Sequence, residues 1–242
     1  MRPTIVLLRF SLGQLLAGRR LLIVVPLVAL PLLLLAVFAA GADVDPSTFT
    51  VDLFRQVVVP LLLPVVSLTF STSALGAELR DGTVTNILLK PLRRGGVLGA
   101  KYLAAVLATL VLLLPAEVAA HLIVAGGVGS TDVLAGLVLA SVVGTLAYCA
   151  LGTLLSLFMA RALLVGLAYA LLWEGAVVGV APSASSLSIR GYTEGVFAAV
   201  LRGGGVDLAV RLGPVSATVL AAVVTLAALV LSVGRLQRMD VR

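Results

Sequence analysis

The sequence is poor in the residues that build disulfides, metal sites and polar surfaces. It contains one cysteine, Cys149, and one histidine, His121, in 242 residues. This excludes an internal disulfide and any metal site made of several cysteines or histidines. Only 12% of the residues are charged, 61% are hydrophobic, and the mean hydropathy is +1.20. A soluble domain of this length needs more polar surface, so we expect the chain to be embedded in a bilayer.

Two further absences limit the function. The net charge is +6, but a basic stripe with interleaved aromatic residues is missing, so we predict no nucleic-acid partner. The phosphate-loop pattern G-x-x-x-x-G-K-[ST] is missing too. "GVLGAK" at 96–101 contains glycines and a lysine, yet no serine or threonine follows and the segment leads into an apolar run. We therefore predict that this chain has no catalytic residues, cofactor or metal of its own.

Six apolar segments are long enough to cross a bilayer, which takes about 20 residues in a helix. Backbone groups in lipid must pair internally, so we expect an all-α membrane protein with six transmembrane helices. Prolines inside these spans are tolerated as kinks in a bundle. The expected spans are 21–40, 57–77, 102–124, 133–160, 162–180 and 214–233, and the prolines are Pro26, Pro31, Pro60, Pro64 and Pro115.

The distribution of basic residues predicts the orientation. An even number of spans places both termini on one side, and that side carries 13 of the 17 basic residues. The positive-inside rule makes it cytoplasmic. We therefore expect a multi-pass protein of the cell membrane with both termini in the cytoplasm. The basic residues of that side are Arg2, Arg9, Arg19, Arg20, Arg80, Lys90, Arg93, Arg94, Lys101, Arg161, Arg235, Arg238 and Arg242.

The first twenty residues allow three interpretations. Ile5, Leu8, Leu12 and Leu15 form a helical stripe flanked by arginines, which favours an interfacial helix over 1–20. The segment could also be an early start of the first span. A cleavable signal peptide is the third interpretation, but the apolar run of 20 residues exceeds the usual limit of about 15.

The most polar stretch, residues 78–101, lies in the expected cytoplasmic loop between spans two and three. Within it, Val84, Ile87 and Leu88 share one face of a short helix that ends near Pro91. Gly95 and Gly96 follow as an expected flexible hinge, with Lys101 at the mouth of span three. The pattern is typical of a small helix that docks into a groove of a partner. Spacing alone leaves open an ordinary loop whose charges only set topology.

This stretch resembles the permease subunits of type-2 ATP-binding-cassette (ABC) exporters. The resemblance rests on five features in this order: an acidic residue, a Gly-Thr pair, an apolar patch, a proline with a following arginine, and a lysine at the next span. One position departs from the family, because this chain has Leu92 where the family often has a small polar residue. It implies a coupling helix seated in a separate ATPase subunit, and a transporter of two permeases, identical or homologous, with two ATPases that hold ATP and magnesium. The implied contact residues are Glu78, Gly82, Thr83, Val84, Ile87, Leu88, Pro91 and Arg93.

Three ionisable residues lie within the expected spans. Glu117 and His121 are four residues apart on one face of span three, and Glu174 lies in span five. Such residues cost several kcal/mol in lipid and usually face the bundle or a water path. Glu117 and Glu174 are therefore candidates for the translocation path. The alternative for Glu117 and His121 is that they pair with each other or lie near the outer surface.

Two other features leave alternatives open. Span four carries Gly136, Ala140, Gly144, Gly152 and Ser156, small residues that suit packing within the chain or at a subunit interface. The longest outer loop, 182–213, contains "SASSLS" as an expected flexible linker. It then carries an apolar stripe that predicts a short helix, either dipping into the outer leaflet to cap an exit path or lying on the surface. The stripe is Val196, Phe197, Val200 and Leu201.

We therefore expect the transmembrane subunit of an ATP-driven exporter. A proton-coupled secondary transporter using Glu117 and Glu174 is the alternative, but it leaves the 78–101 stretch unexplained. An intramembrane metalloprotease is disfavoured by the single histidine, and no serine has a rhomboid-like context. The sequence does not identify the cargo.

Overall fold

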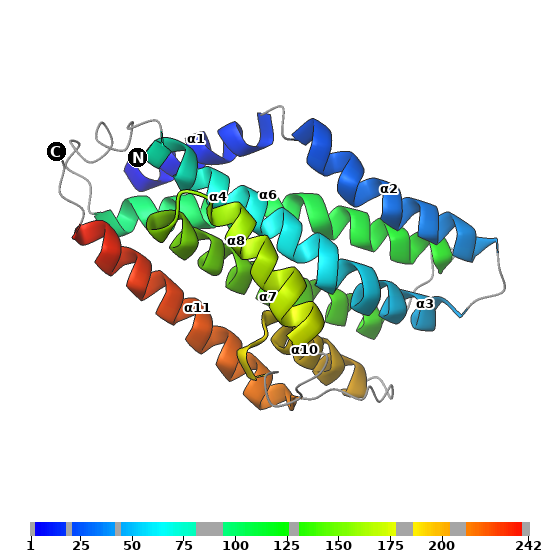
Figure 1. Ribbon diagram of the computed structural model, residues 1–242. Helices are drawn as coiled ribbons and strands as arrows, with labels where there is room; N and C mark the ends of the chain where they lie inside the picture. Colours follow the sequence, from blue (N-terminus) through cyan, green and yellow to red (C-terminus); the bar gives the residue numbers. More distant parts are fainter. Residues whose placement is uncertain are drawn as a thin grey trace.

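The computed structural model describes residues 3–17, 21–41, 45–80, 94–125, 131–177, 186–203 and 212–238. Almost all of them are helical, and the helices form an elongated bundle (Figure 1). In chain order the elements are α1 (Pro3–Ala17), α2 (Leu21–Ala40), α3 (Pro46–Leu53), η1 (Phe54–Leu62), α4 (Leu63–Arg80), α6 (Arg94–Val124), α7 (Thr131–Phe158), α8 (Ala162–Ala168), η2 (Tyr169–Val177), α10 (Ile189–Gly203) and α11 (Pro214–Gln237).

Among the described residues, five helices are long and apolar enough to cross a membrane. They are Leu21–Ala39, Pro46–Gly76, Arg94–Val124, Thr131–Phe158 and Pro214–Gln237. They correspond to the expected spans one, two, three, four and six. The expected fifth span coincides with a shorter apolar helical stretch, Ala162–Ala176, formed by α8 and η2. Residues 178–180 of that expectation lie outside the described part of the chain.

The beginning of α1 and the end of α11 lie at one end of the bundle (Figure 1). We call it the proximal end and the other the distal end. At the proximal end, Leu75 of α4, Leu98 of α6, Leu157 of α7 and Leu236 of α11 form a small apolar cluster. The end of α4 and the beginning of α6 are therefore packed together at this end of the bundle.

The helices on both sides of that segment are longer than the sequence predicted. α4 continues to Arg80, and α6 begins at Arg94 rather than near residue 102. The expectation that Gly95 and Gly96 form a flexible hinge is wrong, because both are helical. A side chain at Gly96 would begin 3.2 Å from Cγ2 of Thr4, so this glycine allows α1 to approach α6 closely.

Of the eight predicted contact residues of the coupling helix, the structure describes only Glu78. The backbone of Glu78 belongs to the last turn of α4. The predicted contacts Gly82, Thr83, Val84, Ile87, Leu88, Pro91 and Arg93 lie outside the described residues. Lys101, expected at the mouth of span three, instead lies two turns inside α6 and is buried.

Helix continues through the prolines of the spans, as expected for a bundle. Pro26 and Pro31 lie inside α2, and Pro115 lies inside α6. Pro60 lies in η1, a π-helical segment whose wider turns replace α-helical hydrogen bonding there. A second π-helical segment, η2, packs against η1 and contains Glu174. Such segments inside longer helices are often found at functional sites.

The small residues of α7 pack within the chain. A side chain at Gly136 would begin 3.2 Å from the ring of Phe197, and one at Gly144 would begin 2.7 Å from Oγ1 of Thr193. A side chain at Gly152 would overlap with the hydroxyl of Ser71. Because α10 and α4 occupy these faces of α7, the structure supports the intrachain alternative of the sequence analysis.

The apolar stripe of α10 faces the bundle. Phe197 and Leu201 are fully buried, and the ring of Phe197 lies 4.4 Å from that of Phe54, centre to centre. The stripe packs on α7 and η1, so it is not the lipid-facing surface that one alternative required. At the other end of the chain, α1 packs on α6 through Leu12, Leu15 and Leu16.

Candidate functional site

A hollow lies at the proximal end of the bundle, between α4 and the turn that joins α7 to α8. It has a volume of about 710 Å³. Its lining residues are Thr69, Thr72, Ser73 and Gly76 from α4, and residues 156–164 from α7, the turn and α8. The buried side chains of Thr72, Ser156 and Leu157 form its floor, while Met159, Arg161 and Leu164 are exposed at its rim.

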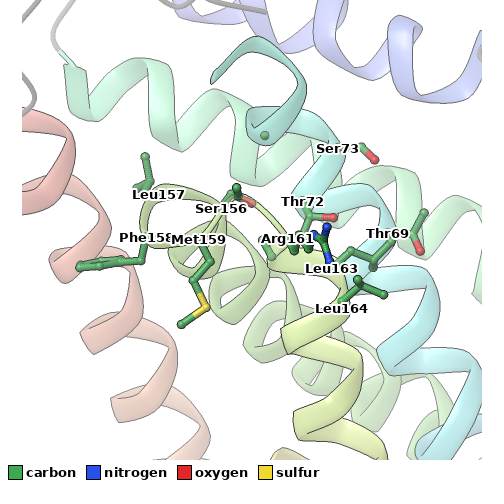
Figure 2. A pocket seen from close by; sticks show the side chains of 13 residues that line it. Thr69, Thr72, Ser73, Ser156, Leu157, Phe158, Met159, Arg161, Leu163 and Leu164 are labelled. Carbon is green, nitrogen blue, oxygen red and sulfur yellow. The ribbon is translucent and has the colours of Figure 1, made fainter. Parts of the chain in front are cut away.

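Polar groups of this cavity point from both walls. Figure 2 shows the side chain of Arg161 directed toward α4, on the side of Thr72 and Thr69. The hydroxyls of Thr72 and Ser156 donate hydrogen bonds to the carbonyls of Leu68 and Gly152. Each of these oxygens therefore keeps lone pairs that can accept a further hydrogen bond.

The proximal ends of α6 and α11 are joined by a side chain. Nη1 of Arg94 donates hydrogen bonds to the carbonyls of Leu236 and Gln237, at 2.9 and 3.0 Å. These carbonyls belong to the last turn of α11, where backbone acceptors have no helical partner and a cation is favourable. The first residue of α6, directly after the segment 81–93, thus fixes the end of the last helix.

At the distal half of the bundle, Glu174 of η2 is the centre of a hydrogen-bond network. Its Oε2 accepts a hydrogen bond from the Tyr148 hydroxyl, and its Oε1 accepts from the Tyr169 hydroxyl at 3.2 Å. Oε1 also accepts from the Ser188 hydroxyl and the Arg190 backbone N–H, at 3.3 and 3.2 Å. One buried carboxylate therefore holds the beginning of α10 against α7 and η2.

Ion pairs and a cap continue this distal network. Nε of Arg190 lies 2.8 Å from Oε1 of Glu194, and Nη2 of Arg55 lies 3.8 Å from Oε2 of the same residue. At the beginning of α3, the Asp45 carboxylate accepts from the backbone N–H and the hydroxyl of Thr48. These hydrogen bonds hold the pKa of Asp45 below its ordinary value, so the cap stays charged at neutral pH.

Glu117 and His121 have different partners. The Ser141 hydroxyl donates to Oε2 of Glu117 at 2.8 Å, and Nδ1 of His121 lies 2.7 Å from the Thr50 hydroxyl. Both residues are buried, and within the described residues Oε1 of Glu117 and Nε2 of His121 have no hydrogen-bond partner. The proposed pairing of Glu117 with His121 is therefore not the arrangement found.

The contact of Glu117 with Ser141 belongs to a regular seam between α6 and α7. Two turns toward the proximal end, the Thr109 hydroxyl lies 3.9 Å from the thiol of Cys149. That thiol also lies 3.7 Å from the carbonyl of Ser67 in α4. The two pairs are eight residues apart on each helix, as expected for antiparallel neighbours. Cys149 is completely buried in this seam.

The structure does not bring Glu117 and Glu174 together into one site. Each is held by a separate set of partners, and neither lines the proximal cavity. The sequence analysis missed the cavity and the tyrosines around Glu174. The available signals were the four hydroxyl residues in "TFSTS" at 69–73 within an apolar span and the lone Arg161 between two spans.

Comparison with known proteins identifies the family. A search of curated proteins found no match. The family model described as "ABC-2 family transporter protein" matches residues 19–184, which is more than half of the chain. The match covers α2 to η2 and includes the stretch 78–101. The chain therefore belongs to the ABC-2 transporter family and is a multi-pass permease subunit of an ABC transporter, whose family implies an ATPase partner.

Proposed function

We propose that the chain forms the translocation path of an ATP-driven exporter in the cell membrane. Two such permeases, identical or homologous, form a dimer with two ATPase subunits that bind ATP and magnesium. The proximal end faces the cytoplasm, because the basic residues gather on that side of the expected topology. The observation that carries the proposal is the family match over 19–184 together with the coupling pattern inside it.

The segment 81–93 is the proposed contact with the ATPase. It is joined to two helices that are packed together at the proximal end by the cluster of Leu75, Leu98, Leu157 and Leu236. A force on the segment would act on the end of α4 and, through Arg94, on the end of α11. A movement of the ATPase would therefore act on α4 and, through Arg94 at the beginning of α6, on α11.

The proximal cavity connects this contact to the path of the cargo. Its α4 wall consists of Thr69, Thr72, Ser73 and Gly76, and Gly76 lies one turn before Arg80. A shift of the segment 81–93 would move this wall relative to the α7–α8 turn. We propose that the cavity opens and narrows during the ATPase cycle and receives cargo from the cytoplasmic side.

The proton-coupled alternative has less support. To carry protons, Glu174 would have to be protonated and deprotonated in turn. Its carboxylate, however, accepts hydrogen bonds from four donors. Its role as an anchor of α10 accounts for that geometry without transport. Glu117, with one oxygen unpartnered among the described residues, stays a predicted residue of the translocation path.

Co-purification with the ATPase encoded beside the gene tests the proposal. Wild type should retain the ATPase in mild detergent, and Ile87→Asp with Leu88→Asp should lose it, because both changes place a charge in the docking face. The matched control is Thr85→Asp with Asn86→Asp, which adds the same charge to the other face of the predicted helix. An ATPase retained equally by both double variants would reduce the segment to a topology-setting loop.

A further inference from the structure

The proximal cavity combines one cation with hydroxyls and an apolar rim. None of the 13 described residues that line it is acidic, and Arg161 is its sole basic residue. Its volume of about 710 Å³ lies within the usual range of small-ligand sites, roughly 300 to 1,000 Å³. The described lining residues therefore carry one positive and no negative charge.

Three side chains that line the cavity leave their donors unused by the described residues. Arg161 forms no ion pair or hydrogen bond through its guanidinium with the described residues, and the hydroxyls of Thr69 and Ser73 form none either. Thr69 and Ser73 are four residues apart on α4 and so lie on one face of that helix. A guanidinium offers five N–H donors in a planar arrangement that matches carboxylate or phosphate oxygens.

The rim of the same cavity suits a hydrocarbon chain. Met159 and Leu164 are exposed beside Arg161, and Leu163 lines the wall between them. Phe158 points away from Arg161 toward α11, where the guanidinium of Arg235 lies 5.2 Å from its ring centre (Figure 2). The positive and apolar parts of the site are thus adjacent but separate, as the two ends of an amphiphile are.

We propose that this cavity binds an amphipathic anion, with its headgroup on Arg161, Thr69 and Ser73 and its hydrocarbon chain along Met159, Leu163 and Leu164. The inference rests on the proposed export function, because it names the chemical class of the cargo. The same chemistry has two sources: an anionic phospholipid of the surrounding bilayer, or a single-chain anionic amphiphile that is transported.

Other ligand classes fit less well. A cationic amphiphile would meet Arg161 without a compensating carboxylate among the lining residues. A polyanion such as a nucleotide would require several cations, and the described lining residues supply one. A neutral sugar would leave the guanidinium without an ionic partner and would gain nothing from the apolar rim.

Binding to the purified full chain in phosphatidylcholine nanodiscs, without the ATPase, tests the inference. The probes are lysophosphatidylglycerol and lysophosphatidylcholine with the same fluorescent acyl chain, each corrected for binding to empty discs. We expect wild type to prefer the anionic probe, and Arg161→Gln to bind it about tenfold more weakly. Arg161→Lys should retain part of the preference, and Thr69→Val with Ser73→Ala should weaken binding by a few fold.

Arg9→Gln is the matched control, because it removes the same charge from an exposed position on α1, outside the cavity lining. It should bind like wild type. A wild type without preference for the anion, or an Arg161→Gln variant that keeps the full preference, would overturn the proposal. If Arg161→Gln folds poorly, a photoreactive form of the anionic probe can be used on the wild-type protein instead. The proposal requires crosslinks within residues 69–76 or 158–164, and crosslinks elsewhere would contradict the site.

Two further experiments distinguish a bilayer phospholipid from a transported amphiphile as the natural ligand. If replacing part of the phosphatidylcholine by phosphatidylglycerol displaces the probe, a bilayer lipid occupies the site. If the probe stays bound and is moved across proteoliposomes by the complex with its ATPase, the site receives cargo. Because binding is measured on the permease alone, loss of ATPase coupling would defeat the exporter proposal and leave this result standing.

Discussion

At the distal half of the bundle, Glu174 accepts hydrogen bonds from Tyr148, Tyr169 and Ser188, whereas at the proximal end Thr69 and Ser73 leave their hydroxyls beside a cavity. The distal polar groups are used to fix helices to one another. The proximal ones are available to a ligand. This difference agrees with the proposed translocation path, in which cargo enters at the proximal end, and variants at both ends can test it.

The largest effect is expected for Glu174→Ala. The change leaves the Tyr148 and Ser188 hydroxyls and the Arg190 N–H without their buried acceptor, which should lower the free energy of unfolding by about 3 kcal/mol. Thermal unfolding in detergent measures it. Tyr148→Phe removes one donor and should cost about 1 kcal/mol. If Glu174→Ala unfolded like wild type, the distal network would not be what holds α10.

Gly152→Ala should have the next largest effect. The new methyl group would overlap with the Ser71 hydroxyl of α4, close to the cavity floor, and overpacking of this kind costs about 1 to 3 kcal/mol. Gly234→Ala in α11 is the control, since nothing lies within 4 Å of its added carbon. That variant should be neutral or up to about 1 kcal/mol more stable. Equal stabilities would mean that α4 and α7 can separate without loss.

Arg94→Gln should cost about 1 kcal/mol, because it loses the hydrogen bonds to the carbonyls of Leu236 and Gln237. If the segment 81–93 contacts the ATPase as proposed, the variant should also lower cargo-stimulated ATP hydrolysis by more than its small loss of stability explains, since Arg94 joins that segment to α11. Arg94→Lys keeps the charge and should be intermediate. The two readouts are the unfolding temperature and the cargo-stimulated ATPase rate; parallel small losses in both would leave Arg94 with a structural role only.

The smallest effect on stability is expected for Thr69→Val with Ser73→Ala, within about 0.5 kcal/mol, because these hydroxyls form no hydrogen bond with the described protein. Ser141→Ala is the contrasting variant. It removes the donor to Oε2 of Glu117 and should cost about 1 to 3 kcal/mol. A costly double variant in the cavity would show that its hydroxyls serve the fold rather than a ligand.

Hydropathy predicted five of the spans because bilayer thickness sets helix length for any sequence. It misplaced the beginning of α6, because Gly95 and Gly96 are poor helix formers in isolation. In the bundle they are helical, and the missing side chain at Gly96 lets Thr4 of α1 come close. Packing against a neighbouring helix overrides the local preference here.

The cavity and the Glu174 network could not be predicted for a different reason. The partners of Glu174 lie from 5 to 26 residues away in sequence, and none is recognisable until α7 and α10 are placed beside η2. Likewise, the hydroxyls of 69–73 acquire a role only when the α7–α8 turn brings Arg161 opposite them. The order of the spans is local information, whereas these sites depend on tertiary packing.

The burial of Cys149 also bears on how this transporter can be studied. Its thiol is enclosed by Thr109 and the carbonyl of Ser67, so water-soluble maleimides should not reach it in the folded protein. The natural chain can therefore serve as its own unreactive background for site-directed labelling. With Ser73→Cys and Met159→Cys, two spin labels would lie across the cavity, so that electron paramagnetic resonance could follow its width while ATP is turned over.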